Sequence, residues 1–206
     1  MSNIEEDLQQ TLKLISADWG MQNNKDDKAT GFIYKMNSLD ECLENIKKQN
    51  VNKEYALHRW YNYMTSIHSE HIFCEFGAVH EKNIYSHDVD IYIDKVPFDV
   101  KLTVYPQKLS SRPYDLTTRK GKNEMIKWYY ENQSQQGRKQ LINRLYVVCD
   151  GKDSDECMKM KSDFALMRKA IGEYMDSVKT KGLHQQVITD GDRKYLVKSD
   201  IILLKY

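Results

Sequence analysis

The sequence predicts an α/β (α+β) domain with a small mixed central β-sheet flanked by helices. Apolar residues recur at three- and four-residue steps over 54–77, which is the spacing of an amphipathic helix. Between 89 and 104 the period changes to two, which is typical of β-strands. The short apolar run 145–149 lies between two further helical patterns, at 122–134 and 153–178. Helices that alternate with strands in this way predict a sheet covered by helices.

The two ends of the chain carry patterns of their own. Helical spacing over 3–16 is followed by a polar segment, 22–30, that we expect to be a loop. Ser38, with Glu41 three residues later, has the pattern of a capping box and predicts another helix. The segment 185–206 predicts two or three strands with a turn at Asp190-Gly191-Asp192. We expect an N-terminal helical extension over 1–50 and a main domain over 51–206.

Composition narrows the class of protein. With 40% apolar and 30% charged residues and a formal net charge of +1, the chain has a globular composition. Its longest aliphatic run, Ile201 to Leu204, is too short to cross a membrane, and its polar N-terminus is unlike a signal peptide. The four cysteines form no CxxC pair, so we do not expect a zinc ribbon or a redox motif. Four scattered thiols indicate a reducing cytoplasm. We therefore expect a cytoplasmic protein with no membrane partner.

Charge is distributed unevenly along the chain. Residues 51–100 contain 4 basic and 8 acidic residues, whereas residues 101–144 contain 10 basic and 3 acidic ones. This order fits a metal site beside a groove for a polyanion, and chance clustering of solvated charges explains it equally well.

The alternating segment 89–104 fits a β-hairpin with a two-residue turn at Asp94-Lys95. Ile93 then pairs with Val96, and side chains of one face repeat every two residues. One face is apolar and the other is polar, as in a sheet with one buried and one solvated face. Asp-Lys is not a favoured turn dipeptide, so the site prediction depends on this register.

The polar face of the hairpin is the predicted metal site. Asp90 falls opposite Asp99, and like charges across a strand pair are destabilising unless a cation lies between them. Mg²⁺ accepts carboxylate oxygens in a shell that keeps several waters. Lys101 points the same way, where it could hold a phosphate or a metal-bound water. Asp88 is an alternative to Asp90 as the first ligand.

In these residues the sequence resembles the PD-(D/E)XK nuclease superfamily. Members bind metal through an acidic residue on one strand and a D/E-x-K motif on the next, which match Asp90 and Asp99-Val100-Lys101. The resemblance covers residues 54–149 and implies a restriction endonuclease-like core. It also implies Mg²⁺ or Mn²⁺ bound by Asp90, Asp99 and the carbonyl of Val100. No proline precedes Asp90 and the two aspartates are closely spaced, so the subfamily stays open.

The resemblance also implies residues outside the hairpin. The family often adds a glutamate from the preceding helix, for which Glu75 is the candidate and Glu81 a competitor. The helix after the catalytic strand often turns polar residues towards the site. Contacts with the nucleic-acid backbone are therefore expected from the residues Gln133, Arg138, Lys122 and Arg119. A solvated helix end explains these residues equally well.

The expected activity is that of a metal-dependent endonuclease, a phosphodiesterase with DNA as the expected substrate and a restriction or defence role by analogy. A homodimer would suit it, because many such nucleases dimerise to cut both strands. One alternative is an inactive nuclease-fold module that binds nucleic acid or a protein partner. Another is a zinc hydrolase that uses His68 and His71, although helix packing explains these histidines more simply.

Overall fold

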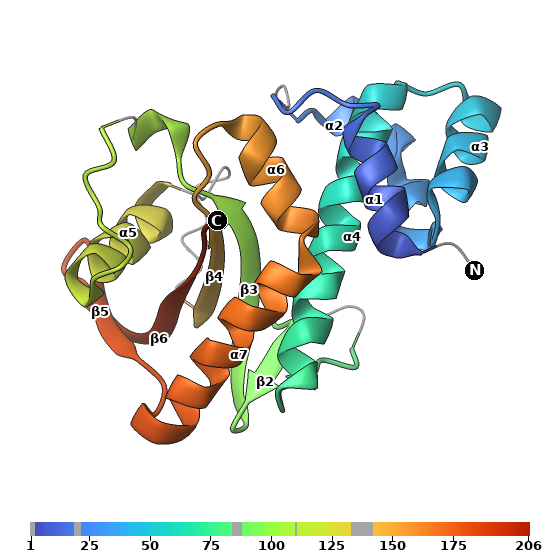
Figure 1. Ribbon diagram of the computed structural model, residues 1–206. Coiled ribbons are helices and arrows are strands. Elements are labelled where there is room, and N and C mark those ends of the chain that lie inside the picture. The colour runs from blue at the N-terminus through green and yellow to red at the C-terminus, as the bar shows by residue number, and fades with distance from the viewer. Residues whose placement is uncertain (1–2, 19–21, 84–87, 110, 133–141) are drawn as a thin grey trace.

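The computed structural model describes residues 3–18, 22–83, 88–109, 111–132 and 142–206 (Figure 1). The N-terminal part contains α1 (Ile4–Leu12), α2 (Asn24–Ala29), η1 (Gly31–Lys35), α3 (Leu39–Gln49) and α4 (Lys53–Glu75). The central part contains β1 (Val79–His80), β2 (Ile91–Ile93), β3 (Val96–Val104), η2 (Gln107–Leu109) and α5 (Arg119–Asn132). The remainder contains β4 (Arg144–Cys149), α6 (Ser154–Ser162), α7 (Phe164–Lys181), β5 (Gln185–Asp190) and β6 (Arg193–Leu204).

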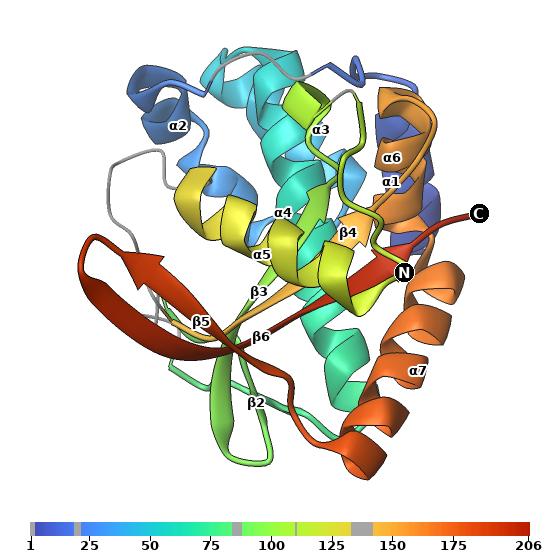
Figure 2. The ribbon, with the colours of Figure 1, turned by 90° about the vertical axis from the view of Figure 1, so that its left-hand side faces the viewer.

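A six-stranded mixed sheet in the order β1-β2-β3-β4-β6-β5 forms the centre of the molecule. Strands β1, β2 and β3 pair antiparallel, β3, β4 and β6 pair parallel, and β5 is an antiparallel edge strand. Figure 1 shows the sheet between α5 on one side and α4, α6 and α7 on the other, and Figure 2 shows α5 lying across it. The expected mixed sheet flanked by helices is therefore confirmed.

Helices on both faces explain why the central strands are so apolar. Leu145, Val147 and Cys149 of β4 are fully buried in the cluster that also contains the α4 and α7 side chains. Tyr146 points to the other face, where its ring stacks on Tyr129 of α5 with centroids 4.6 Å apart. A strand covered on both faces is expected to be a continuous apolar run rather than an alternating one.

The hairpin has the predicted register. Ile93 pairs with Val96, and both Asp94 and Lys95 have left-handed backbone angles, with φ of 50° and 67°. A two-residue turn of this kind needs positive φ at both positions, because its twist then matches that of the strands. The apolar face packs into the core as expected. The polar face is mixed, because Asp99 is only 2% exposed whereas the Lys101 side chain is 44% exposed.

Capping side chains decide the other helix boundaries. Ser38 accepts the backbone N–H of Glu41, as predicted. The expected loop at 22–30 contains α2, because Asn23 caps a short helix there. The single helix expected over 153–178 is two helices, because Asp163 ends α6 and its side chain caps α7.

The N-terminal helices lie beside α4, on its side away from the sheet (Figure 1). Leu8, Ile33 and Cys42 are fully buried and belong to the same apolar cluster as Leu57 of α4. The extension over 1–50 thus shares a core with the main domain. No helix among the described residues has both the length and the apolar character to span a bilayer.

The start of α5 gives a stability prediction. Gly121 is buried there, and an added Cβ would overlap the backbone of Asp115. We expect Gly121→Ala to lower the free energy of unfolding in urea by about 1–3 kcal/mol. Gly31→Ala is the matched control, because no atom lies within 4 Å of its added Cβ. Equal stability of the two variants would contradict the close packing of α5.

Candidate active site

Asp99 lies in β3 with both carboxylate oxygens engaged. Its Oδ1 is 2.5 Å from Nζ of Lys101, and its Oδ2 accepts from Nε of Arg144 at 2.8 Å. The guanidinium of Arg144 in turn lies 5.6 Å from the ring centroid of Tyr130 on α5. A buried carboxylate is costly unless it is paired, so these two cations compensate the charge of Asp99.

The parallel pairing of β3 with β4 brings Arg144 to this position. In the register of the two strands Asp99 lies beside Arg144, and its backbone N–H donates to the carbonyl of Asn143 at 3.1 Å. The Asn143 side chain donates to the carbonyl of Pro97 at 3.0 Å and accepts the backbone N–H of Lys198 at 2.8 Å. Three strands are thus fixed to one another at this end of the sheet.

Asp90 lies beside Asp99 but not in a regular pair with it. Ladder pairing ends at Ile91 and Phe98, and the Asp90 N–H donates to the Phe98 carbonyl at 2.9 Å. The Asp90 carboxylate turns back and accepts the N–H of Val100 at 2.7 Å. Burial raises the pKa of Asp90 and the nearby charge of Asp99 adds to the rise, while the bond from Val100 opposes it.

Glu70 of α4 is the third carboxylate of the site. It is 7% exposed, and its Oε2 lies 2.9 Å from Nε2 of His80. The Nδ1 of His80 lies 2.8 Å from the carbonyl of Glu81, which can only accept, so Nδ1 carries a hydrogen. With a hydrogen on Nδ1, the contact between Glu70 and Nε2 is a hydrogen bond only when a proton lies between the two atoms.

Electrostatic coupling connects Glu70 to the hairpin. Burial raises the pKa of Glu70 to about 7, with a further rise from the charge of Asp90 and opposing effects from His80 and Lys101. We call Glu70, Asp90, Asp99, Lys101 and Arg144 the acidic cluster.

Glu75 lies away from this cluster. Its carboxylate accepts two hydrogen bonds from Arg168 of α7, at 2.9 and 3.3 Å, and it is half exposed. Five residues along a helix correspond to a rotation of about 140°, so Glu70 and Glu75 face different directions. Glu81 accepts from the hydroxyl of Tyr92, and Asp88 is exposed.

The structure describes only two of the four residues predicted to bind nucleic acid, and both make internal contacts. Gln133 and Arg138 lie outside the described residues. Arg119 donates to both oxygens of Asp200, at 2.7 and 3.1 Å, and Lys122 donates to the carbonyl of Ile201 at 2.7 Å. These two cations connect α5 to β6, which limits their reach towards a phosphate.

His68 of α4 packs against α7, and His71 of the same helix is exposed. His68 stacks on Phe164 with ring centroids 4.9 Å apart, and its Nδ1 lies 2.9 Å from the carbonyl of Met64. Within the part of the chain that the structure describes, no group of three or more His, Cys, Asp or Glu side chains is arranged to hold a metal ion.

The donor set of the acidic cluster nevertheless suits a hard cation. Mg²⁺ is usually held by one or two carboxylates, with waters completing its shell, so a cage of three protein ligands is not required. Asp90 and Asp99 provide two such groups. Burial and the nearby charge of Asp99 raise the pKa of Asp90, and a bound cation would favour its charged form.

Glu70, His80 and Arg144 were not identified from the sequence. Only the packing of α4 shows which glutamate faces the hairpin, and only the parallel register brings Arg144 to Asp99. No family model matches the chain, and no curated protein or solved structure matches it.

The raised pKa of Glu70 predicts a pH dependence of stability. Its unfolded value is about 4.5 and its folded value about 7, so the folded state holds the proton more tightly. The stability it contributes is complete below pH 4.5 and is lost as the pH rises to 7. Relative to Glu70→Gln, the wild-type free energy of unfolding should fall by roughly 1–3 kcal/mol across this window.

Urea unfolding at several pH values in EDTA measures this difference. Glu75→Gln is the control, because that glutamate is half exposed and paired with Arg168. A constant difference between wild type and Glu70→Gln from pH 4.5 to 7 would argue against a buried, protonated Glu70.

Proposed function

We propose that the protein hydrolyses phosphodiester bonds in nucleic acid, with DNA as the expected substrate, as a metal-dependent nuclease of the PD-(D/E)XK type. The observation that carries the proposal is the gathering of Glu70, Asp90, Asp99 and Lys101 into one cluster. The order of helix α4, hairpin β2–β3, helix α5 and strand β4 is consistent with the order that the resemblance implies. A restriction or defence role stays an analogy.

Asp90, Asp99 and the carbonyl of Val100 are the groups that would hold Mg²⁺ or Mn²⁺, and Glu70 takes the place assigned to Glu75. When bound, the ion lowers the pKa of a coordinated water and offsets charge on the phosphate.

The chain's own cations act on the phosphate. Lys101 is 44% exposed and reaches the solvent side of Asp99, where its ammonium can orient the attacking water and stabilise charge that develops on the phosphate oxygens. Arg144 is largely buried, and its guanidinium keeps Asp99 oriented. In the reaction the water oxygen bonds to phosphorus, the bond from phosphorus to the leaving oxygen breaks, and that oxygen takes a proton.

The pair of Glu70 and His80 can move a proton during this step. Oε2 of Glu70 and Nε2 of His80 lie 2.9 Å apart, close enough to share a proton, and His80 is 40% exposed. The pair could accept the proton that the water loses or deliver one to the leaving oxygen. A group that transfers a proton at neutral pH should be near the midpoint of its titration there, and Glu70 meets this condition because its pKa is about 7.

A cleavage panel tests the proposal. Single- and double-stranded DNA and RNA are incubated with the protein in Mg²⁺, Mn²⁺ or EDTA. We expect cleavage only with metal, and losses of at least about 10²-fold for Asp99→Asn, Lys101→Ala and Glu70→Gln. Lys108→Ala and Glu75→Gln are matched controls that should cleave like the wild type, because both side chains are exposed outside the cluster. Undiminished cleavage by folded Asp99→Asn or Lys101→Ala would overturn the assignment.

One observation favours a second candidate, a module of this fold that binds nucleic acid or a protein without cleaving. Both oxygens of Asp99 are occupied by Lys101 and Arg144, so a metal could reach them only if a cation moved. Titration calorimetry with Mg²⁺ and Mn²⁺ separates the candidates. Binding that Asp90→Asn abolishes supports the nuclease, and no heat of binding up to millimolar metal supports the module.

A further inference from the structure

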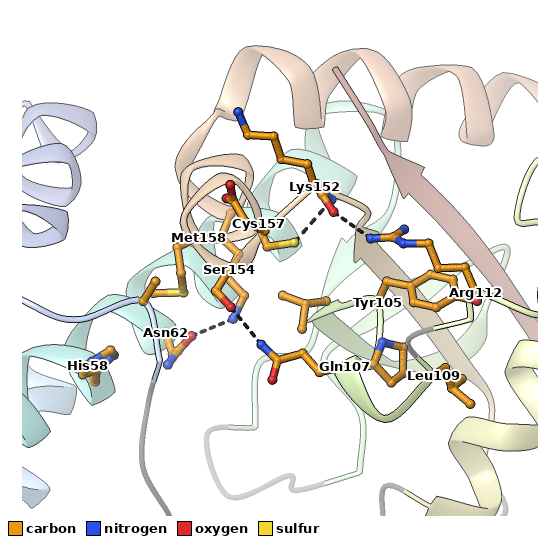
Figure 3. A pocket seen from close by; sticks show the side chains of 16 residues that line it. His58, Asn62, Tyr105, Gln107, Leu109, Arg112, Lys152, Ser154, Cys157 and Met158 are labelled. Atoms are coloured by element: carbon orange, nitrogen blue, oxygen red, sulfur yellow. Dashed lines mark hydrogen bonds between the residues drawn. The ribbon is translucent and has the colours of Figure 1, made fainter.

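A cavity of about 400 Å³ lies at the carboxyl ends of β3 and β4, between α4 and α6 (Figure 3). Val104, the last residue of β3, lines it, and Asp99 is five residues earlier on the same strand. Five residues of extended chain span roughly 17 Å, so the cavity is separate from the acidic cluster. Its volume is within the range of small-molecule sites.

Polar groups converge on one side of this cavity. Nζ of Lys161 donates to Oδ1 of Asn62 at 2.9 Å, which connects α6 to α4. Nε2 of Gln107 donates to Oγ of Ser154 at 2.8 Å, so the hydroxyl hydrogen of Ser154 is available to donate elsewhere. Figure 3 shows Asn62, Ser154 and Gln107 turned towards one another across this side.

The charge on this side is a cation without a carboxylate. Burial lowers the pKa of Lys161, and among the described residues no carboxylate lies within 4.0 Å of its ammonium. Asp153 also lines the cavity, but its carboxylate accepts the N–H of Glu156 and caps α6. Burial lowers the pKa of His58, and the charge of Glu54 opposes this shift only in part, so His58 contributes no second charge at neutral pH.

The remaining walls are apolar and fixed in place. Val104, Tyr105, Leu109 and Met158 line the cavity. At its rim Arg112 lies over the ring of Tyr105 and donates to the carbonyl of Gly151 at 2.7 Å, so the wall is built by internal contacts.

We propose that this cavity binds a small molecule with an anionic group, a carboxylate or a phosphate, on an apolar body. Lys161 and Ser154 receive the anionic group, and the apolar walls contact the body. A buried ammonium without a carboxylate is unfavourable, and an anion from outside removes that penalty. The site is independent of phosphodiester hydrolysis, because it shares no residue with the acidic cluster.

Thermal unfolding with four probes tests this proposal. Benzoate and phenyl phosphate carry the anionic group on an aromatic body, and acetate and inorganic phosphate carry it alone. At constant ionic strength set with NaCl, at least one aromatic probe should raise Tm by about 3–6 °C at ten times its Kd. The preferred probe identifies the anionic group. A rise no larger than that given by acetate or inorganic phosphate would overturn the role of the apolar walls.

Two variants locate the effect. Lys161→Met should abolish the probe-induced rise in Tm, and Lys159→Met, an exposed lysine on the same helix, should retain it. Equal rises in wild type and Lys161→Met would overturn the proposal, as would no rise with any probe. If Lys161→Met does not fold, amide chemical shifts of the wild type decide. Changes at Gly151, Ser154 and Cys157 support the site, and changes confined to other regions refute it.

Discussion

The burial of Asp99 between Lys101 and Arg144 is the interaction on which the rest of the candidate site depends. Lys101 comes from the same strand, whereas Arg144 arrives only because β3 and β4 pair in parallel. Removing one partner of a buried ion pair leaves a charge uncompensated, at a cost of about 3–5 kcal/mol. The register of the sheet and the charge of the site are therefore linked. Burial raises the pKa of Asp90 and the charge of Asp99 adds to that rise, while burial and the charge of Asp90 together raise the pKa of Glu70.

The two ends of β3 have opposite electrostatic character. The acidic cluster lies towards its amino end, and the cavity that contains Lys161 lies at its carboxyl end. The first suits a divalent cation and a phosphodiester, and the second suits a small anion. Because β3 pairs with β4 from Asp99 to Val104, the strand holds the two sites at a fixed separation, and they share no residue.

Three basic residues of the segment 101–144 have internal roles. Arg112 and Arg119 pair with Asp150 and Asp200, and Lys122 donates to a backbone carbonyl. A local excess of positive charge in the sequence thus does not by itself define a surface for nucleic acid, since packing can use the same charges to connect helices to strands. The cleavage proposal depends on the acidic cluster and not on that excess.

Local interactions are what the sequence determined by itself. The cap at Ser38, the hairpin turn at Asp94-Lys95 and the apolar run of β4 depend on residues a few positions apart. Their patterns therefore predicted a helix, the hairpin register and the mixed sheet. Tertiary structure alone decided that Glu70 and not Glu75 faces the hairpin, that Arg144 pairs with Asp99, and that Glu70 contacts His80. Each of these depends on how α4 and β4 pack against β3, which no local pattern specifies.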